Sequence, residues 1–278
     1  MEDGLLREGA LLAGAILAYF AVRNLTAGAP DDAFANGERI VDFEQWLGIA
    51  WEDGIQAAIM GNDAFVTLAN WIYIWGHWPV ILSTAAVLYL WRRDRYYLLR
   101  NALFISGGIG FLFFALMPVA PPRLLEIGLV DTVSGQSSAY RALQPPGLTN
   151  QYAALPSLHI GWNLAVGIVL FMTTTHLAVR AFAVLSPLAM AFAVVATANH
   201  FIVDVAAGMA VVLVGLAGAL TIQRRGADSL ATLADDGPAT PAEAPRRRAT
   251  PVLRSAPCWE RPFRPPGRAA PHVDPCRG

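Results

Sequence analysis

The sequence contains no lysine, few charged residues of any kind and only two cysteines. Of its 278 residues 15% are charged, whereas 55% are hydrophobic, which is too apolar for an ordinary soluble domain. All twenty basic residues are arginine and the formal net charge is −1, so we expect no nucleic-acid partner. Cys258 and Cys276 have no spacing typical of a metal site or a disulfide framework. These absences together indicate a polytopic membrane protein.

Long hydrophobic runs predict six membrane-spanning helices. A helix needs about twenty predominantly apolar residues to cross the hydrocarbon core of a bilayer. The segments with this character are 6–25, 65–91, 97–118, 157–175, 178–197 and 201–222. The interruption "WGHWPV" (75–80) predicts a kink at Pro79 in the second of them. We therefore expect an all-α fold, a bundle of six transmembrane helices.

Residues 39–60 differ from these runs because they mix tryptophans with acidic residues. Trp46 and Trp51 lie here among acidic residues that include Glu44 and Glu52, so the segment is too charged to cross a bilayer. It predicts one or two amphipathic helices that lie in the membrane interface.

The composition changes abruptly at Gln223. Residues 223–278 hold ten of the nineteen prolines and ten of the twenty arginines, with almost no apolar periodicity. Such a segment cannot bury enough apolar surface to fold, so we expect a disordered cytoplasmic tail. The predicted organisation is thus a membrane domain over 1–222, with a motif-bearing core at 65–222, followed by the tail.

The arginines that flank the hydrophobic runs predict the orientation in the cell membrane. They follow the second, fourth and sixth hydrophobic runs, as Arg92, Arg93, Arg95, Arg100, Arg180, Arg224 and Arg225. The positive-inside rule places these three regions, and therefore both termini, in the cytoplasm. The loop 119–155 and the beginnings of the fourth and sixth runs then face the non-cytoplasmic side. Acidic residues before the first run argue against a cleaved signal peptide.

His200 and Asp204 are four residues apart at the beginning of the sixth run. This spacing places both side chains on one helix face, within reach of a hydrogen bond. An ionisable pair in a membrane helix is costly and faces the bundle interior or a water-filled cavity. Asp204 can then select the imidazole tautomer and stabilise its cation, although a purely structural polar pair is also open.

Ser157 and His159 open the fourth run on the same predicted side of the membrane. Pro156 suits the beginning of a helix and Ser157 is a good N-cap, so free N–H groups there favour phosphate. Arg123, in "MPVAPPRLL", adds a planar, permanently charged group just beyond the third run. Together with His200 and Asp204, this set contains the parts that phosphoryl transfer needs.

These residues resemble a known family. "PSLH" (156–159) and "HFIVD" (200–204) are similar to the second and third motifs of the type 2 phosphatidic acid phosphatase superfamily, Pro-Ser-Gly-His and His-x3-Asp. The resemblance covers residues 65–222. Leu158 in place of glycine makes it most similar to the branch that contains fungal inositol-phosphorylceramide synthase, the inositolphosphotransferases.

The resemblance implies a role for each matching residue. His200 would be the nucleophile that forms a phosphohistidine, and Asp204 would orient it. His159 would protonate the leaving oxygen and then activate the acceptor, while Ser157 and Arg123 would hold phosphate oxygens. The implied substrate is a membrane lipid phosphate or phosphodiester, with no metal and no cofactor.

The sequence departs from the family pattern at two basic positions. Leu116 stands where the first motif has lysine, and Val194 where the third motif has arginine. Candidates to replace these charges and polar groups lie in the outer loop, at Tyr140, Arg141, Asn150, Gln151 and Tyr152. Inositol-phosphate transfer from phosphatidylinositol and hydrolysis of a lipid or polyprenyl phosphate both remain open.

Two non-enzymatic interpretations also remain. His77, His159, His176 and His200 could ligate haem or a metal together with Asp204, although the predicted topology separates His176 from His159. A transporter would also carry intramembrane charges, but the six runs have no evident inverted repeat. His77 is expected to be a packing or interfacial residue.

Overall fold

The computed structural model describes residues 2–26, 30–136 and 150–235, and this part of the chain is helical between its loops. The helices are α1 (Glu2–Thr26), α2 (Pro30–Leu47), α3 (Glu52–Met60), α4 (Asp63–Trp75), α5 (Trp78–Trp91), α6 (Arg93–Leu116), η1 (Pro122–Leu124), α7 (Thr132–Gln136), α9 (Leu158–Thr173), α10 (Leu177–Ala196) and α11 (Ile202–Asp235). In the described residues the extended pairing is a single isolated bridge, Val119 with Ala153. The all-α prediction is confirmed.

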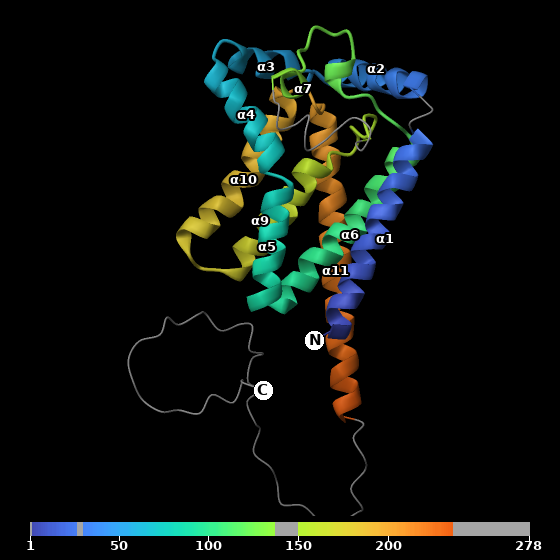
Figure 1. Cartoon of the computed structure of the whole chain (residues 1–278), viewed down its shortest axis with the longest axis vertical. Helices are drawn as coiled ribbons and strands as arrows, with labels where there is room; N and C mark the ends of the chain where they lie inside the picture. Colours follow the sequence, from blue (N-terminus) through green and yellow to red (C-terminus); the bar gives the residue numbers. More distant parts are fainter. Residues whose placement is uncertain (1, 27–29, 137–149, 236–278) are drawn as a thin grey trace, which may run out of the picture.

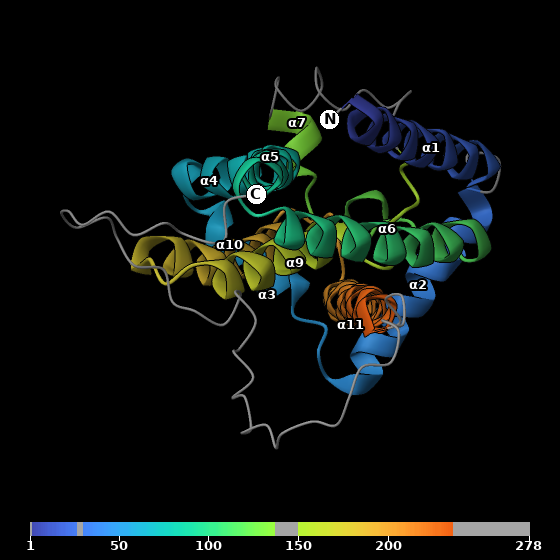
Figure 2. The ribbon, with the colours of Figure 1, turned by 90° about the horizontal axis from the view of Figure 1, so that it is seen from below.

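The long helices form a bundle around α6, α9 and α11 (Figure 1). Seen along the bundle, α11 lies against one side of α6 and α1 against the other (Figure 2). The main core contains Ile81, Leu88, Leu98, Leu99, Ala102, Ala165, Val166, Val169, Val212, Leu216 and Ala219. Large apolar side chains also cover the outside of the bundle, for example Leu177, which is 80% exposed. This distribution suits a protein that is surrounded by lipid.

All six predicted runs are helical, but not all meet the length and hydropathy expected of a span. Within the described residues, α6, α10 and α11 do so, and α4 with α5 forms a fourth candidate if the bent pair is one span. The apolar α9 has only 16 residues, and α1 is not among the candidates. The chain is therefore a membrane protein with three or four candidate spans, and six spans stay a prediction.

The predicted kink in the second run lies between α4 and α5, which meet at 44°. The break is at Gly76 and His77, and Pro79 sits within the first turn of α5. Proline is tolerated there because the first N–H groups of a helix have no intrahelical partner. The break brings a histidine into the middle of the run.

The interfacial segment forms two helices, α2 and α3, which lie across one end of the bundle (Figure 1). It is longer than predicted, since α2 begins at Pro30, with acidic residues in its first turn that favour a helix start. Trp46 and Trp51 are exposed, as expected of an interfacial helix. Glu44 and Glu52, in contrast, are buried against the bundle.

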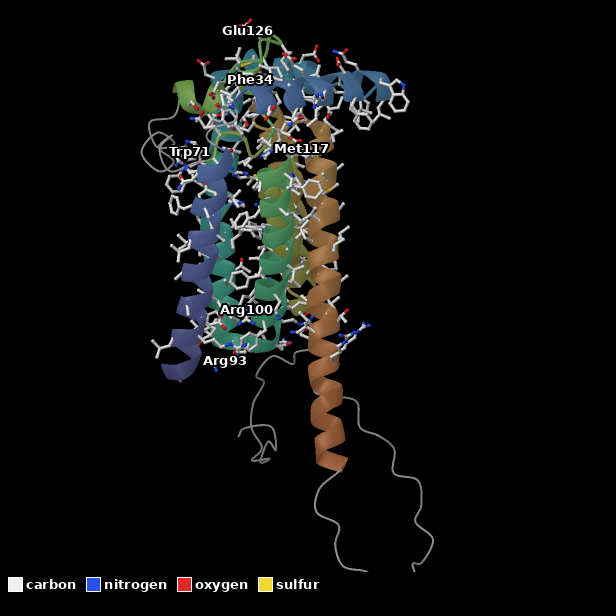
Figure 3. All side chains as sticks on the ribbon, turned by 90° about the vertical axis from the view of Figure 1, so that its right-hand side faces the viewer. Phe34, Trp71, Arg93, Arg100, Met117 and Glu126 are labelled. Carbon is white, nitrogen blue, oxygen red and sulfur yellow. The ribbon has the colours of Figure 1, made fainter. Side chains whose placement is uncertain are left out.

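The other end of the bundle carries the arginines. Arg93 and Arg100 lie at the opposite end from Phe34 and Glu126 (Figure 3). There Glu8 of α1 forms an ion pair with Arg100 and accepts a 2.8 Å hydrogen bond from the Tyr96 hydroxyl, which attaches α1 to α6.

The expected disordered tail does not begin at Gln223. The last helix, α11, continues to Asp235, well beyond the apolar part of the run. The rest of the predicted tail, with Cys258 and Cys276, lies outside the described residues.

Candidate active site

His200 lies in the short turn between α10 and α11. The turn is made by Ala198, whose φ of +54° is uncommon for a residue with a side chain. The N–H groups of Asn199 and His200 both donate to the Val194 carbonyl at 3.0 Å. These bonds hold the backbone of His200 against the end of α10.

The ring of His200 is fixed through Nδ1. This nitrogen lies 2.9 Å from the Ala154 carbonyl oxygen and 3.4 Å from Oδ2 of Asp204, and both are acceptors. Nδ1 therefore carries the proton, which leaves the lone pair of Nε2 for a nucleophilic role. The predicted pairing of His200 with Asp204 is present, and the carbonyl of Ala154 is a partner that the sequence did not indicate.

Three acidic side chains accept hydrogen bonds from N–H groups at the beginning of α11. Oδ2 of Asp204 accepts from Phe201 N at 2.9 Å. Glu52 accepts from Ile202 N at 3.0 Å and Glu44 from Val203 N at 2.6 Å. Negative groups are favourable at this position because the N–H groups and the helix dipole are positive there.

Glu44 and Glu52 come from α2 and α3, so the interfacial helices are attached directly behind His200. Burial, together with the hydrogen-bonded carboxyl of Glu52, raises the pKa of Glu44 to about 9. At neutral pH Glu44 therefore retains its proton. In the sequence both residues belong to the charged segment 39–60. Nothing there distinguishes them from its other acidic residues, Asp42 and Asp53.

Ser157 stands at the N-cap of α9, as predicted, but its side chain does not cap the helix. Its backbone N–H donates to the Asp204 carbonyl at 3.0 Å, which joins the beginnings of α9 and α11. The backbones approach this closely because Gly208 faces the Ser157 carbonyl, where a Cβ atom would overlap the oxygen.

His159 lies beside His200, with 5.6 Å between the ring centroids. Its ring also stacks on Tyr73 at 4.6 Å and contacts His77 at 4.3 Å. His77, expected to be a packing or interfacial residue, therefore packs directly against His159. The sequence signal for this contact is the interruption at Gly76, which places the polar ring of His77 in the middle of a hydrophobic run. His176, at the N-cap of α10, is a full length of α9 away, roughly 24 Å at the α-helical rise.

Arg123 is attached to the turn that carries His200. Its Nε donates to Oδ1 of Asn199 at 2.9 Å, and its Nη1 lies 3.7 Å from Oδ2 of Asp131. The two positions that lack the family's basic residue carry apolar side chains and bring no polar group to the site. Leu116 is 76% exposed on α6, and Val194 is fully buried.

The proposed outer-loop substitutes have no demonstrated role in the site. Tyr140 and Arg141 lie outside the described residues. Asn150 N donates to the Tyr19 hydroxyl at 2.9 Å, Tyr152 O accepts from Val119 N at 2.9 Å, and the Tyr152 ring lies 6.3 Å from that of Phe34. Gln151 is exposed.

Unpartnered polar atoms gather at this site. In the described part of the chain, four buried side-chain nitrogen or oxygen atoms lack a hydrogen-bond partner, and three are His77 Nδ1, Ser157 Oγ and Asp204 Oδ1. Buried polar groups are normally paired, so such a concentration is typical of a place that binds a polar ligand. No group of three or more His, Cys, Asp or Glu residues in the described ranges is arranged to hold a metal ion.

The comparisons with known proteins show the family of the chain. The family model for the PAP2 superfamily matches residues 38–218, well over half of the sequence. The chain therefore belongs to the PAP2 superfamily, and it is a phosphatase-type enzyme. The crystal structure of LpxE from Aquifex aeolicus aligns with a TM-score of 0.48 and 14% sequence identity, covering 61% of this chain and 92% of that chain. No curated protein sequence matches.

Proposed function

We propose that this enzyme hydrolyses a membrane lipid phosphate through a phosphohistidine at His200. The observation that carries the proposal is the pairing of His200, held through Nδ1 with Nε2 unused, with a second imidazole 5.6 Å away. Two histidines at this separation can reach the same phosphoryl group from two sides. Ser157 Oγ, buried and unpartnered nearby, can donate to a phosphate oxygen.

In the first step Nε2 of His200 attacks phosphorus and the bond from phosphorus to the lipid oxygen breaks. The electron pair leaves with that oxygen, which takes a proton from the His159 imidazolium. In the second step neutral His159 takes a proton from water, and the water oxygen attacks the phosphohistidine. The phosphorus–nitrogen bond breaks, its electron pair returns to Nε2, and inorganic phosphate is released.

Positive charge for the phosphate oxygens comes from fewer groups than the family pattern provides. Arg123 supports this role because its guanidinium donates to Asn199, the residue that precedes His200. Asp204 lies behind the nucleophile and stabilises the positive charge that develops on its ring.

The test is to trap the covalent intermediate with labelled lipid phosphate at matched protein levels. His200→Ala should capture no label and lose turnover, whereas His159→Ala should still be labelled by a substrate with a very good leaving group. His176→Ala is the matched control because His176 is exposed at the distant end of α9. Acid-labile label in His200→Ala at the wild-type level would end the assignment.

Transfer of inositol phosphate from phosphatidylinositol is the alternative. The sequence feature that favours it is Leu158 in place of the family's glycine. Leu158 packs against Gly110 of α6, where a Cβ atom would lie 3.0 Å from its side chain. This contact accounts for the leucine through packing, so we place hydrolysis first. Incubation with labelled phosphatidylinositol and a panel of acceptors separates the two, since a transferase would form an inositol-phosphate ester of the acceptor in preference to free inositol phosphate.

We further infer that the site faces the non-cytoplasmic side of the cell membrane. Phe34 belongs to the interfacial helix α2, which lies beside the beginning of α11. Arg93 and Arg100 lie at the opposite end of the bundle from Phe34 (Figure 3). The positive-inside rule assigns the arginine end to the cytoplasm, together with both termini.

A further inference from the structure

Four aromatic rings form a continuous stack through the site. Tyr73 and His159 lie 4.6 Å apart with 24° between their planes, and His159 and His77 lie 4.3 Å apart at 38°. The stack continues from His77 to Trp162 at 5.8 Å and 13°. Rings from the α4–α5 segment therefore alternate with rings from α9.

Sequence spacing explains the alternation. Tyr73 and His77 are four residues apart in the α4–α5 segment, and His159 and Trp162 are three residues apart on one face of α9. The rings of the two pairs therefore alternate along the stack. The break after Trp75 gives His77 the freedom to point back toward α9 instead of following the helix of α4.

His159 differs from His200 in what supports its charge. The ring of His200 has Asp204 beside it, whereas in the described residues the ring of His159 makes no hydrogen bond or ion pair with a carboxylate. Its two nearest ring neighbours are Tyr73 and His77, both of which are buried. An imidazolium that is partly removed from water loses hydration and needs another source of stabilisation.

Aromatic faces can provide that stabilisation. A cation close to the face of an aromatic ring is attracted by the negative potential of the π system, and the attraction grows when water is excluded. The close ring contacts also limit tilting of the His159 ring.

We propose that Tyr73 and His77 are positioning residues for His159, holding its ring between theirs and stabilising the imidazolium that protonates the leaving oxygen. The proposal rests on the proposed function of His159. It assigns the contribution of His77 to the face of its ring and not to its nitrogen atoms.

The experiment compares two substrates that differ in their need for an acid. A long-chain alkyl phosphate has a poor leaving group, whereas 4-nitrophenyl phosphate leaves with little protonation. Tyr73→Leu and His77→Leu should each lower kcat/KM for the alkyl phosphate about tenfold while changing that for 4-nitrophenyl phosphate by less than about twofold. Tyr73→Phe and His77→Phe, which retain a ring, should keep the wild-type ratio of the two substrates.

Two further variants guard against loss of folding. His77→Gln retains polarity without a ring and should behave like His77→Leu. Trp78→Leu is the matched control, because Trp78 contacts His77 and Trp162 edge-on but is not a member of the stack. It should leave the substrate ratio unchanged.

Each other outcome overturns the inference in a recognisable way. Equal losses for both substrates in the leucine and glutamine variants would indicate a structural role alone. A wild-type ratio in His77→Gln, or a phenylalanine variant as impaired as the leucine one, would assign the effect to hydrogen bonding. If His159→Ala itself shows no dependence on the leaving group, the proposed function fails; if it does while the leucine variants do not, only this inference fails.

Discussion

The side chain of Glu44, on an interfacial helix, accepts a 2.6 Å hydrogen bond from the backbone N–H of Val203 in the first turn of α11. The residues are far apart in the sequence, yet this bond and the neighbouring one from Ile202 to Glu52 connect the layer of α2 and α3 to the helix that carries Asp204. The position of the interfacial layer is thus coupled to the geometry behind His200.

The raised pKa of Glu44 predicts a pH dependence of stability. The folded protein retains the proton until about pH 9, whereas an unfolded chain releases it near 4.5. Between these values the folded state binds more protons, so the free energy of unfolding falls as pH rises, by at most about 1.4 kcal/mol per pH unit from this group. Glu44→Gln mimics the protonated form and should remove this part of the slope, which thermal unfolding in detergent from pH 5 to 9 would measure.

Glu38→Gln provides the control for that experiment because Glu38 is exposed on the same helix. Its unfolding midpoint should follow the wild-type pH profile. A Glu44→Gln profile parallel to the wild type would show that Glu44 does not hold a proton in the folded protein.

Asp204→Asn should lower kcat strongly and leave helix content unchanged. Asparagine can still accept from Phe201 N, but it cannot stabilise positive charge on His200. The loss should approach about 10⁴-fold, the size of the loss when the acid of a catalytic triad is replaced by its amide. Single-turnover phosphorylation of His200, with circular dichroism, would measure both quantities, and unchanged phosphorylation would contradict the role of Asp204.

Gly208→Ala should separate α9 from α11 and reduce both stability and activity. The new Cβ atom would overlap the Ser157 carbonyl oxygen, and a backbone neighbour cannot move aside as a flexible side chain can. Overpacking of this kind costs about 1–3 kcal/mol. Gly108→Ala is the matched control, since a Cβ atom there meets nothing within 4 Å and alanine favours the helix. The melting temperatures of the two variants should therefore move in opposite directions.

Reporter fusions test the predicted orientation. A reporter that is active only outside the cytoplasm should be active when fused after Val130, in the loop near the site, and inactive when fused after Asp235, at the end of α11. Activity at both positions, or at neither, would contradict the assigned topology.

Activity should persist in excess chelator. The residues proposed to bind the phosphate are imidazoles, a hydroxyl and a guanidinium, whereas magnesium sites use carboxylates and water. The rate should be measured before and after dialysis against EDTA, with added Mg²⁺ as the comparison. A loss that only a divalent ion restores would count against the metal-free mechanism.

Local patterns were sufficient for the helices and for one pair in the site. The hydrophobic runs predicted the long helices because membrane helices satisfy their backbone groups internally and need only an apolar exterior. The separation of four residues correctly indicated the pair of His200 and Asp204, although His200 lies in the turn before α11 and not on the helix itself. The length of the interfacial helices was underestimated, because Pro30 and its acidic neighbours begin α2 before the apolar pattern starts.

The sequence by itself determined the helical membrane fold, the family motifs and the spacing that pairs His200 with Asp204. Tertiary structure decided the rest: the burial of Glu44 and Glu52 behind α11, the Ala154 carbonyl at His200, and the insertion of His77 between His159 and Trp162. None of these contacts has a local signal, because each joins segments that are distant in the chain. Which polar side chain becomes buried, and against which partner, depends on how the helices pack, and periodicity along one helix carries no information about its neighbours.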